Sequence, residues 1–391
     1  VAQRHGHVGG IGDHHRGPGH RGQHAVSGEG LHEPLLPLLL AAGGTAGHIE
    51  PALNLAEALI RRTPTEVTVL GGTRGLEGVL VPARGFALRT VPAVPIPWRP
   101  SLDLVRLPGR LRRSVDEAER HLRETGAQVV VGFGGYAAAP GYLAARRLRL
   151  PIVIHEANAR PGLANRLAAR FTPYVFTAVP GTMPRAEVIG LPLRASISGL
   201  DRGAERLAGL AAFGLEADRP VLLVFGGSQG AVRINAALGA ALPALLASGI
   251  QVLHAVGPRN DPPPAEPGYV PVPYLDRMDL AYAAADLAVV RAGAMTCAEL
   301  SAVGLPAVYV PLPIGNGEQR LNALPIVSAG GGVIVDDAEF TGQWITENIV
   351  PLMHDGVRLA AMSAAARAHG VRDADDRLAQ RVVEIVRKAD R

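Results

Sequence analysis

The chain has 391 residues, of which 48% are hydrophobic and 19% are charged. This is enough apolar material for two cores and excludes a wholly disordered protein. The single cysteine, Cys297, excludes a disulfide framework and a multi-cysteine metal site. The formal net charge of +4 is mild and does not indicate a nucleic-acid partner. No apolar run reaches the roughly 18–20 residues that a membrane-spanning helix needs.

The N-terminal segment 1–34 differs from the rest of the chain. It holds seven of the 13 histidines, many glycines and almost no apolar periodicity. A histidine-rich tract of this kind is compatible with metal binding. The interpretation that we favour is a disordered tail over 1–34, because the segment lacks the apolar residues needed for a core.

An apolar segment at 35–42 follows a basic stretch and has the composition of a signal-peptide core. It continues directly into Gly43-Gly44-Thr45, however, and that transition is typical of a strand followed by a tight turn. We therefore predict a first β-strand here. It is expected to begin after Pro37, because proline is disfavoured in central strands.

Strand and helix signals then alternate. Apolar runs that end in glycine-rich turns predict strands in the first half at 38–42, 67–70, 129–131 and 151–154. A second series predicts strands at 221–225, 252–255, 287–290 and 307–310. Helical spacing of apolar residues predicts helices at 48–62 and at 376–391. The alternation indicates an α/β protein with two parallel sheets, and the boundary between them is expected within 190–218.

Three loops share one design, in which a strand is followed by two glycines, a hydroxyl or aromatic residue, and a helix. They are 43–48, 132–136 and 226–231. Glycines let backbone amides approach a ligand, and the helix N-terminus carries positive partial charge, so a phosphate or diphosphate is the expected ligand. The alternative is that tight strand-to-helix turns need glycine in any case. No loop has the P-loop pattern or a dinucleotide fingerprint.

A further helix start is predicted within 291–299. Thr296 and Glu299 have the spacing of a capping box, in which both side chains would satisfy backbone amides at the helix start. The functional alternative is that Glu299 binds a ribose diol while the helix start faces a diphosphate. Both interpretations use the same helix but compete for the hydrogen-bonding capacity of Glu299.

Several motifs occur in one order, at 43–53, 155–166, 226–231, 291–299 and 319–325. Together they closely resemble the UDP-N-acetylglucosamine–N-acetylmuramyl-(pentapeptide) pyrophosphoryl-undecaprenol N-acetylglucosamine transferases, the MurG-type enzymes. The resemblance implies the GT-B fold, with two Rossmann-like parallel-sheet domains and an interdomain cleft. It further implies an acceptor domain over 35–195, a donor domain over 196–375, and a C-terminal helix over 376–391 that returns to the first domain.

The implied reaction is an inverting transfer of N-acetylglucosamine from UDP-N-acetylglucosamine to the C4 hydroxyl of undecaprenyl-pyrophosphoryl-MurNAc-pentapeptide (lipid I), forming lipid II in peptidoglycan biosynthesis. His48 is the expected base, because the positive end of a helix disfavours a charged imidazolium. The alternative is that His48 only caps the helix or orients the acceptor. Glu156 is the second candidate base, or else a structural hydrogen-bond acceptor, and His155 is expected to be structural.

The resemblance also implies a set of substrate-binding residues. Those expected to bind the nucleotide and its sugar are Arg194, Ser228, Leu275, Ala294, Met295, Thr296, Glu299 and Gln319. Those expected to approach from the acceptor domain are Thr45, Ala46, Gly47 and Asn158. Within this set, Ser228 is expected to hold a diphosphate oxygen, the backbone of Leu275 to face the uracil, and Gln319 to contact sugar hydroxyls.

We expect no cofactor and no obligatory metal. An Asp-x-Asp pattern that could bind a metal does not occur at a strand end. The one at 373–375 lies beside a helix predicted to be exposed and is interpreted as a solvated face. The departing diphosphate is instead expected to be stabilised by amides, helix dipoles and Arg194.

The implied acceptor is attached to a lipid, so the enzyme is expected to be peripheral, at the cytoplasmic face of the cell membrane. Residues 96–113 interleave apolar side chains such as Trp98 with arginines that include Arg112 and Arg113. This composition suits an anionic membrane surface. The alternative is an ordinary helix whose apolar side faces the core and whose arginines are solvated.

Two other functions are compatible with the same fold. A UDP-N-acetylglucosamine 2-epimerase would use the same donor but would need no lipid acceptor. A non-catalytic UDP-sugar-binding protein would bind the donor and release no UDP when given lipid I. UDP release with and without an acceptor would separate all three.

Overall fold

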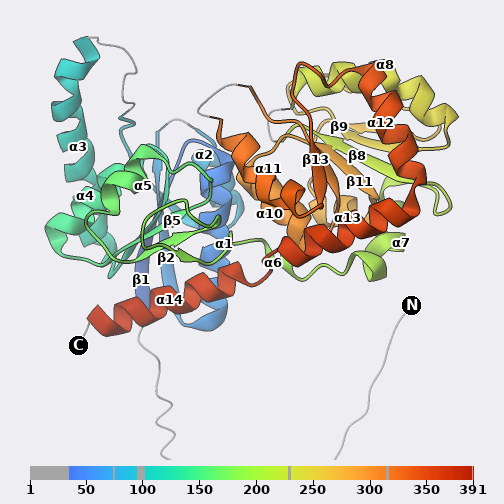
Figure 1. The fold of residues 1–391 in the computed structure, drawn as a ribbon. Coiled ribbons are helices and arrows are strands. Elements are labelled where there is room, and N and C mark those ends of the chain that lie inside the picture. Colours follow the sequence, from blue (N-terminus) through green and yellow to red (C-terminus); the bar gives the residue numbers. More distant parts are fainter. Residues whose placement is uncertain (1–34, 74, 95–101, 228–229, 314–316, 390) are drawn as a thin grey trace, which may run out of the picture. The chain divides into compact units, whose positions relative to one another are not determined.

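The computed structural model describes residues 35–391, apart from 74, 95–101, 228–229, 314–316 and 390 and the side chains of 102–106. The tail predicted at 1–34 lies outside the described residues. The described chain forms two parallel sheets flanked by helices (Figure 1), ordered β3-β2-β1-β4-β5-β6-β7 and β10-β9-β8-β11-β12-β13. The predicted α/β class with two parallel sheets is therefore confirmed.

The strands of the first sheet are β1 (Leu36–Ala42), β2 (Thr65–Gly72), β3 (Ala87–Val91), β4 (Val130–Gly134), β5 (Ile152–Glu156), β6 (Val175–Thr177) and β7 (Glu187–Val188). The helices that accompany them are α1 (Ala46–Arg62), α2 (Glu77–Ala83), α3 (Leu102–Thr125), α4 (Ala138–Leu148) and α5 (Leu163–Ala168). Consecutive residues of β1, such as Leu38 and Leu39, enter different hydrophobic clusters. Both faces of this sheet are therefore buried, as expected for parallel strands.

The prediction that the first strand begins after Pro37 is wrong, because β1 begins at Leu36. Pro37 pairs with Glu66 of β2, whereas the pairing of β1 with β4 begins only at Leu39. Proline therefore lies near the start of the strand, before the ladder to β4 begins. Its carbonyl still accepts a hydrogen bond from the amide of Gln128, at 2.9 Å.

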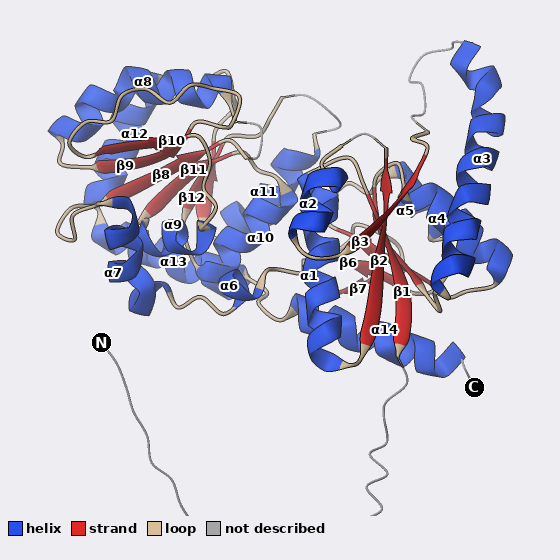
Figure 2. Cartoon of the chain, turned by 180° about the vertical axis from the view of Figure 1, so that it is seen from behind, coloured by secondary structure: helices blue, strands red, loops and turns tan. Residues whose placement is uncertain are grey.

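The strands of the second sheet are β8 (Val221–Phe225), β9 (Gln251–Ala255), β10 (Tyr269–Val272), β11 (Leu287–Val290), β12 (Ala307–Tyr309) and β13 (Gly332–Ile334). Its helices are α6 (Ala195–Ser198), α7 (Arg202–Phe213), α8 (Val232–Ala247), α9 (Met278–Ala284), α10 (Ala294–Val303), α11 (Glu318–Ser328), α12 (Gly342–His354) and α13 (Gly356–His369). Figure 2 shows these helices on both faces of the sheet. Two hydrophobic clusters, one on each face, form the core of this half.

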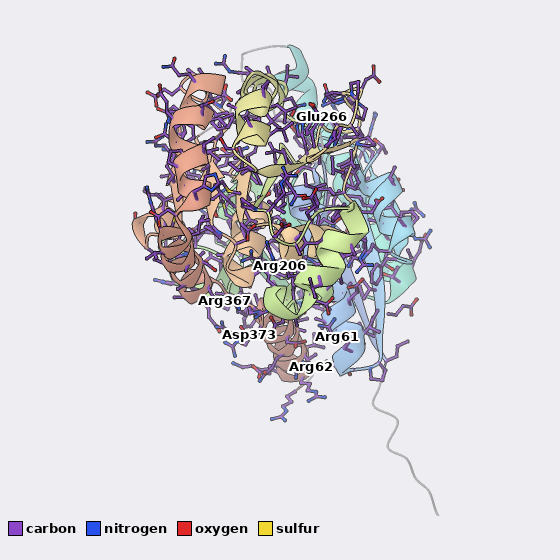
Figure 3. The ribbon with its side chains drawn as sticks, turned by 90° about the vertical axis from the view of Figure 1, so that its right-hand side faces the viewer. Arg61, Arg62, Arg206, Glu266, Arg367 and Asp373 are labelled. Atoms are coloured by element: carbon purple, nitrogen blue, oxygen red, sulfur yellow. The ribbon has the colours of Figure 1, made fainter. Side chains whose placement is uncertain are left out.

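The last helix, α14 (Ala374–Ala389), packs on α1 (Figure 2). Its apolar side chains, including Leu378 and Val382, belong to the same cluster as β1 and α1. The prediction that 373–375 forms a solvated face is wrong for Asp375, which is buried and pairs with Arg61 of α1 at 2.7 Å. Its neighbour Asp373 is exposed; Asp373 and Arg61 are both labelled in Figure 3.

Over the described part of the chain, no helix has both the length and the apolar character needed to cross a bilayer.

Candidate functional site

The turn between β1 and α1 presents the start of a helix at the carboxyl end of the first sheet. Gly44 adopts a φ of +92°, a conformation that favours glycine. Thr45 is the N-cap of α1, but its side chain makes no capping hydrogen bond. Thr45 and Gly47 are exposed and Ala46 is half-buried, so the predicted residues of this turn lie together at an accessible helix start.

His48 lies in the first turn of α1. Its Nδ1 is 3.3 Å from the hydroxyl of Thr45. Its ring lies against Gly134 at the end of β4, where a Cβ atom would be 3.2 Å from the ring Cδ2. Burial lowers the pKa of His48 below its ordinary value, against smaller opposing effects from Glu156, the Gly43 backbone and Glu77. The ring is therefore neutral at neutral pH and able to accept a proton.

Glu156, at the end of β5, organises the turn that follows it. Its Oε1 accepts a hydrogen bond from the amide of Asn158 at 3.0 Å. Its Oε2 accepts hydrogen bonds from the amide of Gly162 at 3.0 Å and from Asn165 Nδ2 at 2.9 Å. The hydroxyl of Tyr142 donates in turn to Asn165 Oδ1 at 2.7 Å. Both carboxylate oxygens thus have partners within the protein.

His155 precedes Glu156 on β5 and is buried. Its Nε2 donates to the carbonyl oxygen of Gly190 at 2.8 Å, so the proton of the neutral ring lies on Nε2. Burial lowers the pKa of His155 to about 4, against the effect of the Gly190 hydrogen bond. These contacts tie β5 to the chain segment that leaves the first sheet.

The helix starts after β8 and β11 are uncapped, as is the start of α1. Helix α10 has Gly293 as its N-cap and α8 has Ala231, and neither has a side-chain cap or an acidic residue in its first turn. The capping box predicted from Thr296 and Glu299 is therefore wrong, since Thr296 lies inside the first turn. Backbone amides at these two starts are available to an anionic ligand.

Glu299 makes a different contact from the one a capping box requires. Its Oε2 accepts a hydrogen bond from the hydroxyl of Tyr282 at 2.7 Å. Burial raises the pKa of Glu299 to about 7, although the Tyr282 hydrogen bond and Arg194 oppose this shift. The carboxyl group thus changes its charge near neutral pH.

Arg194 connects Glu299 to the first half. Its Nη2 pairs with Glu50 Oε1 at 3.0 Å, and Arg84 pairs with the other oxygen of Glu50 at 3.1 Å. Burial opposes the charge on Arg194, but Glu50 and Glu299 outweigh that effect and raise its pKa. The predicted nucleotide-binding arginine therefore lies between a carboxylate of α1 and one of α10.

A small cavity of about 60 Å³ is lined by residues of both halves, which include Ala157 and Ala294. Asn322 of α11 also lines the cavity, and its side chain contacts residues of the first half. The Oδ1 atom of Asn322 accepts a hydrogen bond from the amide of Ala159 at 2.9 Å, and its Nδ2 lies 3.4 Å from Asn158 Oδ1. The structure thus brings the predicted residue Asn158 close to the start of α10.

Two other predicted residues make contacts of their own. Gln319 is in the first turn of α11, where its Oε1 accepts the amide of Leu312 at 2.9 Å. Leu275 is buried in the second core. In the part of the chain that the structure describes, no hydrogen bond or ion pair joins Gln319 or Leu275 to His48 or Arg194. Ser228 lies outside the described residues.

Sequence reasoning missed Glu50, Glu77 and the bridging contacts of Asn322. Glu50 and Glu77 are buried carboxylates, at 8% and 1% exposure. No local pattern distinguishes them, because their burial and partners come from other elements. Within the described ranges, no group of three or more His, Cys, Asp or Glu side chains could hold a metal ion.

Comparison with known proteins identifies both halves. The chain matches the glycosyltransferase family 28 N-terminal domain at residues 38–177 and the family 28 C-terminal domain at residues 221–378. These two segments contain most of the first and second sheets, respectively.

Relatives and a solved structure cover nearly the whole chain. A relative from Streptomyces avermitilis, named UDP-N-acetylglucosamine--N-acetylmuramyl-(pentapeptide) pyrophosphoryl-undecaprenol N-acetylglucosamine transferase, is 58% identical over 89% of this chain and 98% of its own. A relative of the same name from Acidothermus cellulolyticus is 60% identical over 88% and 96%. The crystal structure of Acinetobacter baumannii MurG is 30% identical with a TM-score of 0.71, covering 91% of this chain and 100% of that one.

These matches confirm the two-domain GT-B fold and a glycosyltransferase enzyme. The chain belongs to the UDP-N-acetylglucosamine--N-acetylmuramyl-(pentapeptide) pyrophosphoryl-undecaprenol N-acetylglucosamine transferase family.

Proposed function

We propose that this chain transfers N-acetylglucosamine from UDP-N-acetylglucosamine to the C4 hydroxyl of lipid I, forming lipid II for peptidoglycan. The observation that carries the proposal is the match over 98% of a relative named for this transfer, since that match includes both halves. The hydroxyl attacks C1 of the α-linked donor from the opposite face, which inverts the configuration and releases UDP.

His48 acts as the base in this proposal. Its lowered pKa keeps the imidazole neutral, and its place at an accessible helix start lets an acceptor reach it. Glu156 is the weaker candidate, because both of its oxygens already accept hydrogen bonds from the turn at 158–165. Its role in the proposal is to hold that turn, and with it Asn158, beside the acceptor.

The donor binds to the second half. The uncapped starts of α8 and α10 favour the negative charge that develops on the departing diphosphate, and Arg194 adds a positive charge beside them. Ala294, Met295 and Thr296 form the first turn of α10 and would contact the diphosphate and ribose. Glu299 would accept hydrogen bonds from the ribose hydroxyls.

The proposed site for the uracil and the sugar involves three more residues. The backbone at Leu275 would face the uracil, and Ser228 would contact a phosphate oxygen. The Oε1 atom of Gln319 accepts a hydrogen bond from the amide of Leu312. Its Nε2 would therefore be the group that donates hydrogen bonds to the sugar hydroxyls.

The lipid-linked acceptor requires contact with a membrane, and α3 is the proposed contact. The N-terminal part of α3 extends beyond the neighbouring α4 (Figures 1 and 2), and Arg112 and Arg113 are exposed. Trp98 lies outside the described residues. Exposed arginines attract anionic lipids, which would hold the enzyme peripherally at the cytoplasmic face of the membrane.

The decisive experiment measures UDP release from the purified chain with UDP-N-acetylglucosamine, with and without a soluble lipid I analogue. Acceptor-dependent release of UDP, together with a β-1,4-linked disaccharide product, is expected. Release of UDP without acceptor and with formation of a 2-epimer would instead identify an epimerase. Donor binding without turnover in either assay would identify a binding protein.

A further inference from the structure

A buried carboxylate lies beneath the turn between β1 and α1. Glu77 opens α2, and only 1% of its surface is exposed. Its Oε1 accepts hydrogen bonds from the amide of Gly44 at 2.7 Å and from the amide of Gly72 at 3.1 Å. One side chain therefore joins the turn after β1 to the end of β2.

Three glycines leave the space that this carboxylate occupies. A Cβ atom at Gly43 would lie 2.7 Å from Glu77 Oε1, and one at Gly71 would lie 2.9 Å from its Cγ. A Cβ atom at Gly75 would approach Oε2 more closely still. Any larger residue at these positions would displace the carboxylate, so the turns and the side chain fit one another.

We propose that Glu77 is a positioning residue for the transfer, whose carboxylate fixes the Gly43–Thr45 turn and thereby the first turn of α1 that carries His48. The proposal rests on the function proposed above for His48. Hydrogen bonds from amides to a carboxylate are charge-assisted and stronger than neutral ones. Because His48 follows Gly44 within one helical turn, a shift of the Gly44 peptide shifts the imidazole.

The charges around His48 come from few elements. Glu156 faces it from the end of β5 and Glu77 from the start of α2, and both raise the pKa of His48 against the larger effect of burial. The ring of Tyr136, in the turn after β4, lies near Gly44. Oε2 of Glu77 accepts no hydrogen bond in the described part of the chain. Among the described residues, Glu77 therefore accepts hydrogen bonds through Oε1 alone, whereas Glu156 uses both of its oxygens.

Two variants separate the reach of Glu77 from its charge. Glu77→Asp keeps the charge but withdraws the carboxylate by one methylene, whereas Glu77→Gln keeps the length and removes the charge. Glu66→Gln is the matched control, because Glu66 is exposed near the opposite end of β2. Circular dichroism and thermal unfolding confirm that each variant folds before it is assayed.

Both Glu77 variants are expected to lower kcat by about 10- to 100-fold, because small displacements of a reacting group have effects of this size. The KM for UDP-N-acetylglucosamine and the affinity for UDP should change less than about twofold, since the donor binds to the second half. Glu66→Gln should leave all three unchanged. Unchanged kcat in Glu77→Asp, or loss of kcat in parallel with loss of UDP affinity, would overturn the proposal.

The pH profile and NMR test the same idea without relying on the rate alone. Removing the negative charge in Glu77→Gln should lower the pKa of His48 and move the acid limb of kcat/KM to lower pH. Glu77→Asp should leave the position of the acid limb of kcat/KM unchanged. In ¹⁵N-glycine-labelled wild-type protein, the Gly44 amide should exchange more slowly than that of exposed Gly78.

The NMR measurements also distinguish a failure of this proposal from a failure of the proposed function. If wild-type protein releases no UDP with the lipid I analogue, the proposed function fails, yet the Gly44 exchange rate and the His48 titration still test the positioning contact. A Gly44 amide that exchanges as fast as the Gly78 amide would overturn the positioning role. This measurement needs no variant, so it stands even where Glu77→Gln does not fold.

Discussion

In the first half of the molecule, carboxylates of the protein bind the amides of the turns after the strands, whereas the helix starts after β8 and β11 have no such partner among the described residues. Glu77 accepts hydrogen bonds from an amide after β1 and from the last amide of β2, and Glu156 accepts hydrogen bonds from amides after β5. Helices α1, α8 and α10 all begin with no side-chain cap and no acidic residue in the first turn, so the two halves differ in the backbone amides just before the helix and not in the capping of the helix.

The difference shows how two similar sheets are suited to different ligands. A carboxylate that already occupies the amides of a turn disfavours an anion at the same place, because the charges repel and the donors are used. Uncapped helix starts keep their amides for an anion. The amides bound by Glu77 and Glu156 are therefore less suited to an anion than those at the starts of α8 and α10, which bind the diphosphate under the proposed function.

The sharpest test of this division is His48→Ala. Loss of the base should lower kcat by roughly 10²–10⁴-fold, the usual contribution of general base catalysis. UDP affinity should not change, because His48 belongs to the acceptor side. UDP release with a lipid I analogue and calorimetric titration of UDP measure the two quantities. His354→Ala, at an exposed histidine on α12, serves as the control, and full turnover in His48→Ala would eliminate the base role.

A second test concerns one buried histidine from each half. Burial lowers the pKa of both His155 and His254 to about 4, from the ordinary 6.5. Between these pH values the unfolded chain binds protons that the folded chain does not, so stability falls as pH falls through this window. The loss should approach about 3 kcal/mol for each histidine.

Histidine NMR titration together with urea unfolding at several pH values checks this expectation. Signals assigned to His155 or His254 that titrate near 6.5 in the folded protein would contradict it. A difference between the two histidines would show that the two halves bury them unequally.

Membrane binding should depend on the first half. Replacing Arg112 and Arg113 with glutamine should weaken partition onto anionic phospholipid vesicles by roughly 30-fold, since each arginine near such a surface contributes about 1 kcal/mol. Added salt should reduce wild-type binding in the same direction. The control is Arg259→Gln with Arg358→Gln, at exposed positions of the second half. Equal weakening by both pairs would remove α3 from the membrane contact.

The smallest expected effect concerns Glu299 in the second half. Glu299→Gln should weaken UDP binding by roughly tenfold at pH 8, because a hydrogen bond to a charged group contributes about 1.5–3 kcal/mol. Since the pKa of Glu299 is about 7, wild-type affinity should decline as pH falls below that value. The variant should lose this pH dependence, and Glu347→Gln should keep it. Identical curves for Glu299→Gln and wild type would contradict a carboxylate contact with ribose.

Much of the architecture could be predicted from local patterns. The strands predicted at 221–225 and 287–290 have the observed bounds of β8 and β11. The glycine turn before His48 and the amphipathic helix α14 were also predictable, because apolar periodicity and turn residues act over a few positions. The family resemblance then supplied the reaction, which near-full-length relatives support.

Local patterns failed where a side chain is bound by a distant element. Thr296 and Glu299 have capping-box spacing, yet the helix begins earlier and Glu299 contacts Tyr282 of α9. Asp375 lies in a charged stretch that suggests solvent, yet Arg61 of α1 covers it. Each error arose because spacing gives the neighbours along one element and not the partner across an interface.

The sequence alone determined that this protein has two parallel-sheet halves with glycine turns at their strand ends, since those features depend on short-range periodicity and backbone conformation. Only the tertiary structure decided which carboxylate holds which turn. Glu77 and Gly44 are 33 residues apart in the chain, and their contact depends on the neighbouring placement of β1 and β2 in the sheet. Burial lowers the pKa of His48. Burial depends on the packing of the whole fold, so no local motif in the sequence could have given this shift.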